Sequence, residues 1–129
     1  TVLMGFTTYH QIVTELSPDR WAYEGMQTYV LTHKDISDKK EITFTEETPE
    51  VLLERLKGQE GKDIWICGGA DIVNQMVQRD LIDDYRITVI PVILGKGIRL
   101  FDGENPKIKL RLISAKCYNG MTDLVYRRE

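Results

Sequence analysis

Cysteine and histidine are scarce in this chain, which has two of each among its 129 residues. Cys67 and Cys117 stand far apart, and neither they nor His10 and His33 form the paired spacing of a structural zinc site. Both cysteines fall in strand-like segments, so we interpret them as small buried hydrophobic side chains rather than as a disulfide. The sequence therefore predicts no metal site.

The chain also has no excess of basic charge and no long apolar runs. Lysine and arginine number 17 against 20 aspartates and glutamates, which gives a formal net charge of -3. Because nucleic-acid-binding domains usually carry a basic patch, nucleic acid is not an expected partner. No segment approaches the length of a membrane span, and no leader of charged and then apolar residues is present. We therefore expect a cytoplasmic protein with no membrane partner.

The chain begins inside an apolar run, because Val2-Leu3-Met4 follows Thr1 directly. A first strand rarely starts so abruptly, so we expect residues 1–129 to form a single domain that lacks its N-terminal portion. A domain of this length buries roughly two thirds of the surface that its unfolded chain exposes. A hydrophobic core can therefore hold it together without disulfides.

Hydrophobic patterning predicts strands that first alternate with helices and then pair with one another. The expected strands are Val2–Gly5, Tyr29–Leu31, Ile42–Phe44, Ile64–Cys67, Arg86–Ile90, and two long ones at about Leu110–Tyr118 and Met121–Arg127. The last two flank Asn119-Gly120, which is a strong hairpin signal. This order predicts an α/β fold with a central, mostly parallel mixed sheet, flanking helices and an antiparallel C-terminal hairpin.

Three helices are expected between these strands. The first starts with a capping box of Thr8 and Gln11, the second has Thr48 as its N-cap and Gly58 as its stop, and the third follows Gly69. Their inner faces repeat with helical spacing: Tyr9, Ile12, Val13 and Leu16; Leu52, Leu53 and Leu56; and Ile72, Val73, Met76 and Val77.

Glycine and hydroxyl residues follow three of the predicted parallel strands. The segments are Gly5-Phe6-Thr7-Thr8, Thr32-His33-Lys34 and Gly68-Gly69. Ligands of parallel sheets bind outside the carboxyl ends of the strands. Glycine lets a ligand approach the main chain closely, and a helix that starts there presents unpaired N–H groups to an anion. We therefore predict a cradle for a pyrophosphate and a further phosphate, although Gly-Gly at a strand end often serves only the turn.

These motifs resemble the dihydrofolate reductase superfamily, and in particular the reductase domain of the bifunctional riboflavin-biosynthesis deaminase-reductase and its stand-alone relatives. The matching segments are 2–9, 66–70, 81–84 and 90–101. The last of them, Pro-x-x-Leu-Gly-x-Gly-x-x-Leu-Phe, is the most specific for the riboflavin-type branch. The resemblance implies a dihydrofolate reductase-like fold whose N-terminal strand precedes this chain, and it implies NADPH as cofactor.

The resemblance also implies positions for the cofactor and the substrate. Along the pyrophosphate and the nicotinamide ribose it places Gly68, Gly69, Ala70 and Asp71, with Gly5, Thr7 and Thr8 supporting the phosphates from the other helix. Near the adenosine 2′-phosphate it places Thr32, His33 and Lys34. At the nicotinamide end and the substrate mouth it places Ile90, Leu94, Gly95 and Gly97.

Two departures from the family pattern bear on the chemistry. The family usually has Arg after Met-Gly, whereas this chain has Phe6. Lys34 can supply the charge instead, but only as a point charge rather than as a planar fork. The segment that carries the acidic residue of folate reductases lies before Thr1, so no catalytic residue is assigned. The pairs Glu46-Glu47 and Asp83-Asp84 do not replace it, because neighbouring strand residues point to opposite faces.

Several of these residues also have ordinary structural interpretations. Thr7 and Thr8 are residue types that commonly cap helices, independently of any phosphate. His33 is expected in a solvated loop. Trp65 and Tyr9 are expected in the core.

We predict an NADPH-dependent reductase of a small heterocycle, similar to 5-amino-6-(5-phosphoribosylamino)uracil reductase, that works as a homodimer. Hydride transfer from a nicotinamide requires no nucleophile or metal from the protein. The alternatives are a dihydrofolate or pterin reductase, a non-catalytic nucleotide-binding module on the same fold, and a flavin- or mononucleotide-binding protein.

Overall fold

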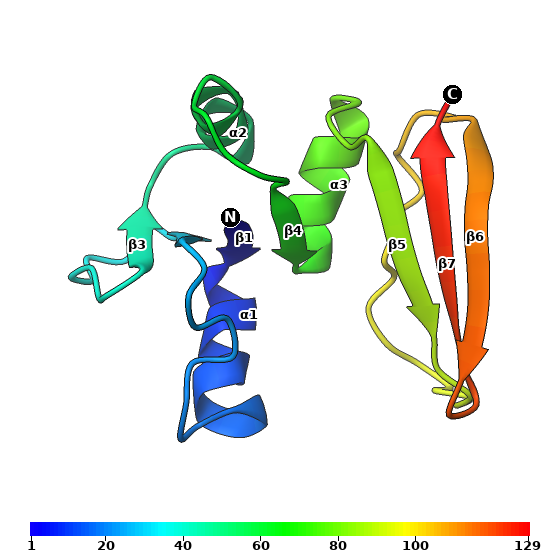
Figure 1. The fold of residues 1–129 in the computed structure, drawn as a ribbon, viewed down its shortest axis with the longest axis horizontal. Coiled ribbons are helices and arrows are strands. Elements are labelled where there is room, and N and C mark those ends of the chain that lie inside the picture. The colour runs from blue at the N-terminus through cyan, green and yellow to red at the C-terminus, as the bar shows by residue number, and fades with distance from the viewer. The chain divides into compact units, whose positions relative to one another are not determined.

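Four parallel strands form the sheet of the amino-terminal unit (Figure 1). The computed structural model describes residues 1–129, which divide into the units Thr1–Gln75 and Met76–Glu129. The strands are β1 (Val2–Gly5), β2 (Thr28–Leu31), β3 (Ile42–Thr45) and β4 (Trp65–Gly68), in the order β3-β2-β1-β4. Because β1 pairs in parallel with both β2 and β4, and β2 with β3, all four carboxyl ends lie at the same edge.

Helices follow three of these strands. α1 (Phe6–Gln11) leaves the end of β1 and continues as the π-helical segment η1 (Ile12–Leu16). α2 (Pro49–Lys57) follows β3, and α3 (Ala70–Gln78) follows β4 (Figure 1). The N-cap of α2 is the predicted one, because the Thr48 hydroxyl accepts a hydrogen bond from the Val51 N–H at 3.3 Å. None of the helices is both long and apolar enough to cross a bilayer.

The core of the first unit lies on both faces of its sheet. On one face Val2, Met4 and Val30 are fully buried and belong to one apolar cluster with Tyr9 of α1. Side chains alternate along a strand, so Leu3 and its partner Tyr29 face the other way. There the Arg55 guanidinium of α2 lies 5.4 Å from the centre of the Tyr29 ring. Both faces of this sheet are therefore covered.

The second unit is an antiparallel meander of three strands. β5 (Asp84–Val89), β6 (Leu110–Tyr118) and β7 (Met121–Arg128) lie in the order β5-β7-β6, with β7 in red between its partners (Figure 1). Asn119 and Gly120 both have positive φ, 47° and 76°, as a two-residue hairpin turn requires. Arg127 forms a fork to the Asp84 carboxylate at 2.7 and 3.0 Å. The α/β class with an antiparallel C-terminal hairpin is confirmed.

Four local predictions are wrong. The capping box of Thr8 and Gln11 does not form, because β1 runs directly into α1 and Gly5 occupies the N-cap position, so that Thr8 is already inside the helix. Leu16 is 69% exposed, because the wider π-helical turn breaks the predicted spacing. Trp65 is 50% exposed on the outermost strand of its sheet. Cys117 is exposed on β6, although Cys67 is partly buried.

Candidate functional site

The three segments predicted to form a phosphate cradle follow β1, β2 and β4 at one edge of the sheet, and the glycines among them, Gly5, Gly68 and Gly69, are called the glycine cradle below. The register pairs Gly5 of β1 with Leu31 of β2, and Met4 with Gly68 of β4. The three strand ends that the sequence singled out are therefore neighbours in the sheet. All of them belong to the first unit.

The glycines at this edge lie where the first turns of α1 and α3 come close together, with room for no more than a Cβ atom in van der Waals contact. A Cβ atom on Gly69 would lie 3.4 Å from the Thr8 hydroxyl, and one on Gly5 would lie 3.4 Å from Ile72 Cγ1. The first turn of α1 therefore lies against the first turn of α3. Gly68 has a φ of +124°, which L side chains rarely adopt, and its peptide bond to Gly69 is cis.

α3 presents its free N–H groups at this place. The first hydrogen bond of the helix runs from the Val73 N–H to the Gly69 carbonyl at 3.1 Å, so the preceding amides have no partner within the helix. Together with the helix dipole, such amides favour an anion. The Asp71 carboxylate is exposed and accepts a hydrogen bond from Gln75 Nε2 at 2.9 Å.

The threonines at the start of α1 do not cap it. No side-chain hydrogen bond caps this helix, since its N-cap residue is Gly5. Thr7 is exposed and Thr8 is partly buried. The capping role that these residue types commonly have is therefore excluded for both, and the Thr8 hydroxyl lies next to Gly69.

The end of β2 forms a tight bend around Thr32. The Thr32 N–H donates to the Thr45 carbonyl at 2.9 Å, and the Thr32 hydroxyl accepts from the Lys34 N–H at 3.1 Å. This bend turns His33 and Lys34 out of the sheet, and both side chains are exposed. The expectation of a solvated His33 is confirmed.

Lys34 lies over Phe6, the residue at which the sequence departs from the family that it resembles. Its ammonium nitrogen lies 4.2 Å from the centre of the Phe6 ring, which makes a cation–π contact. The salt bridges of the structure do not include Lys34. A cation without a carboxylate partner is therefore held at the carboxyl end of the sheet.

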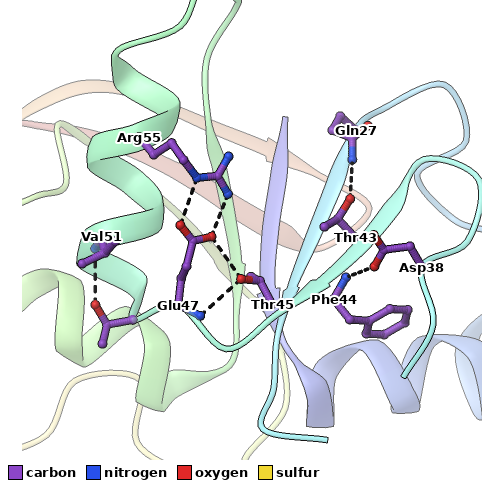
Figure 2. Close-up of polar contacts among 9 residues, drawn as sticks. Gln27, Asp38, Thr43, Phe44, Thr45, Glu47, Val51 and Arg55 are labelled. Carbon is purple, nitrogen blue, oxygen red and sulfur yellow. Dashed lines mark hydrogen bonds and ion pairs between the residues drawn. The ribbon is translucent and has the colours of Figure 1, made fainter. Parts of the chain in front are cut away.

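The end of β3, by contrast, is occupied by groups of the protein itself (Figure 2). Arg55 of α2 donates through Nε and Nη2 to the two carboxylate oxygens of Glu47 at 2.9 and 2.7 Å, and the Thr45 hydroxyl donates to the same carboxylate at 3.0 Å. The hydrogen bonds from Arg55 lower the pKa of Glu47 below its ordinary value. Glu47 is therefore a structural ion-pair partner rather than an acid or base.

A tyrosine that the sequence did not single out contacts Cys67, the residue before the glycine pair. The Tyr23 hydroxyl and the Cys67 sulfur are 3.1 Å apart. Burial, and then the contact with Cys67, raises the pKa of Tyr23 to about 12. Tyr23 follows a loop with no periodic pattern, so only the tertiary structure brings it next to β4.

The residues predicted for the substrate mouth lie in the second unit, on the loop between β5 and β6. Ile90, Leu94, Gly95 and Gly97 are all exposed there. Gly95 has a φ of +77°, and a Cβ atom on Gly97 would collide with Leu94 Cδ2 at 2.6 Å. Gly95 thus serves the conformation of this loop, whereas the exposed Leu94 side chain can move away from a Cβ atom at Gly97. Its apolar side chains are open to solvent, Ile93 by 98%.

Comparisons with known proteins agree with this architecture. The family model described as RibD C-terminal domain matches residues 9–126. The uncharacterized protein YwjB of Bacillus subtilis is 39% identical over 131 residues, which cover 99% of this chain and 73% of YwjB. The uncharacterized protein YyaP of the same organism is 26% identical over 147 residues, which cover 95% of this chain and 78% of YyaP.

A solved structure supports the fold independently. A protein of Shewanella sp. PV-4, provisionally assigned to riboflavin biosynthesis, superposes with a TM-score of 0.83 over 99% of this chain and 73% of its own. Its sequence identity of 22% makes this a similarity of fold alone. The dihydrofolate reductase-like architecture expected from the sequence is thereby confirmed.

Proposed function

Because the chain belongs to the RibD C-terminal domain family, we propose that it is an NADPH-dependent reductase of a small heterocycle. The observation that carries the proposal is the glycine cradle, where the first turns of α1 and α3 meet beside an unpaired lysine. A dinucleotide phosphate fits the chemistry of this edge, since it needs backbone amides, hydroxyl donors and one cation.

The residues that would hold the cofactor follow from the order of the strands. The pyrophosphate would lie on Gly5, Gly68 and Gly69, against the amides of α3 and the hydroxyl groups of the first turn of α1. The adenosine 2′-phosphate would lie at the end of β2, with Thr32 and Lys34. When bound, the nicotinamide supplies the hydride, and the protein contributes position and electrostatics.

We propose a pyrimidine of the riboflavin pathway as the substrate class, in the manner of 5-amino-6-(5-phosphoribosylamino)uracil. The family membership and the segment 90–101 support this choice over a pterin. NADPH oxidation measured with that pyrimidine and, separately, with dihydrofolate tests it. Turnover of dihydrofolate alone would reassign the substrate, and cofactor binding without any turnover would leave a nucleotide-binding module.

Replacement of Lys34 by alanine tests the cofactor. Loss of a charged hydrogen bond to a phosphate weakens binding by about tenfold to a hundredfold, so NADPH affinity falls by that factor while NADH affinity stays unchanged. Titration of intrinsic fluorescence measures both dissociation constants. Lys40→Ala is the control, since Lys40 is exposed in the same loop. Equal losses for the two cofactors would remove Lys34 from the phosphate.

A further inference from the structure

We infer that Phe6 is a positioning residue for the 2′-phosphate of the cofactor, acting through Lys34. This inference rests on the proposed function, because it concerns the cofactor of that same site. A phenylalanine cannot itself bind a phosphate, so the position where the family usually has arginine carries no charge here. The cation over that position is instead the ammonium group of Lys34, 4.2 Å from the centre of the Phe6 ring.

The two residues come from different strand ends. Phe6 opens α1 after β1, and Lys34 follows β2, the neighbouring parallel strand. The aromatic ring is partly buried: it packs on the core cluster and lies 5.9 Å from the Tyr9 ring. The ring is therefore fixed by the core, while the lysine that it holds is exposed.

The contact with the ring restricts the conformations of the flexible lysine side chain. Lysine carries a point charge on a four-carbon stem, and ordering that stem costs side-chain entropy on binding. A cation–π contact holds the ammonium group in place before the ligand arrives, and it leaves the donors on the far side free. Two exposed carboxylates, Asp35 and Asp38, follow Lys34 in the same loop, but neither forms a salt bridge with it. Asp38 instead accepts a hydrogen bond from the Phe44 N–H at 2.8 Å.

The position of Lys34 suits the 2′-phosphate of the adenosine rather than the pyrophosphate. β2 and β4 are separated only by β1, so their ends are about 10 Å apart at the usual strand spacing. A dinucleotide that rests its pyrophosphate on the glycines of β1 and β4 extends its adenosine toward β2. The Phe6–Lys34 pair thus discriminates NADPH from NADH, and it does not contribute to the affinity for both.

The test is a double-mutant cycle with Phe6→Leu, Lys34→Ala and the combined variant, each titrated with NADPH, NADH and adenosine 2′,5′-bisphosphate. Phe6→Leu keeps an apolar side chain of similar size and removes only the ring. We expect it to lower the affinity for NADPH and for adenosine 2′,5′-bisphosphate by about twofold to fivefold, the range of an exposed cation–π contact. The affinity for NADH should not change. In the Lys34→Ala background, Phe6→Leu should have no further effect. Phe6→Tyr should keep the native preference for NADPH over NADH, because a tyrosine ring also binds a cation.

Four results would overturn the inference. An equal loss of NADPH and NADH on Phe6→Leu would give the ring a merely structural role. A full effect of Phe6→Leu in the Lys34→Ala background would show that it does not act through the lysine. Failure of the native protein to bind any of the three ligands would overturn the proposed function together with the inference, whereas tight NADPH binding without an effect of Phe6→Leu would overturn the inference alone.

Discussion

Alanine at Gly68 and at Gly69 adds the same methyl group to adjacent residues, yet the structure predicts opposite consequences. A Cβ atom on Gly68 would meet nothing within 4 Å, but the φ of +124° is strained for any L residue. Such strain costs about 1–3 kcal/mol. The free energy of unfolding of Gly68→Ala should therefore fall by that amount, which lowers the melting temperature by about 4 °C per kcal/mol.

Gly69→Ala should instead fold normally and bind the cofactor poorly. Its φ lies outside the strained range, and its Cβ atom would only touch the Thr8 hydroxyl at 3.4 Å. Alanine at a compatible glycine position adds about 0.4–1 kcal/mol of stability by restricting the unfolded chain. The methyl group would lie between the first turns of α1 and α3, where overpacking against a phosphate costs about 1–3 kcal/mol. This corresponds to a loss of affinity of about fivefold to 150-fold.

Urea unfolding and fluorescence titration with NADPH and NADH measure the two properties on the same samples. We expect Gly69→Ala to lower the affinity for NADPH and NADH equally, because the backbone at Gly69 would contact the pyrophosphate, which both cofactors contain. A wild-type stability for Gly68→Ala would refute the argument from its backbone conformation. Wild-type affinity for both cofactors in Gly69→Ala would refute the placement of the pyrophosphate at this glycine.

Two further predictions concern α2. Thr48→Ala removes the N-cap and should lower the free energy of unfolding by about 1 kcal/mol in urea titrations; an unchanged midpoint would mean that the cap contributes nothing. Glu47→Gln should lose stability at pH 7 but not at acidic pH, because the pKa of Glu47 is lowered in the folded state by Arg55 and the gain is lost as the pH falls through that value. The loss should be about 1 kcal/mol or less for a partly exposed pair, and Glu46→Gln, as the control, should show no such pH dependence.

The sequence determined much of the fold because local and global signals agree. The periodic leucines and the Thr48 cap specify α2, and Asn119-Gly120 specifies the hairpin through the positive φ that both residues adopt. The wrong local predictions depend on distant parts of the chain. Whether Trp65 is buried depends on its strand being the outermost of the four, which no local pattern encodes.

The candidate site, too, could be predicted from the sequence only in part. The glycines and hydroxyl residues could be found from the sequence, because they follow recognisable strands and parallel strands end at one edge. Their contacts could not: Gly69 meets Thr8, Lys34 lies over Phe6, and Tyr23 lies beside Cys67 only in the folded chain. Side-chain contacts between separate strand ends depend on sheet order and register, and these are set by packing over the whole unit rather than by any one segment. The sequence by itself thus identified residues that meet at one edge of the sheet, and the tertiary structure decided which of them are in contact.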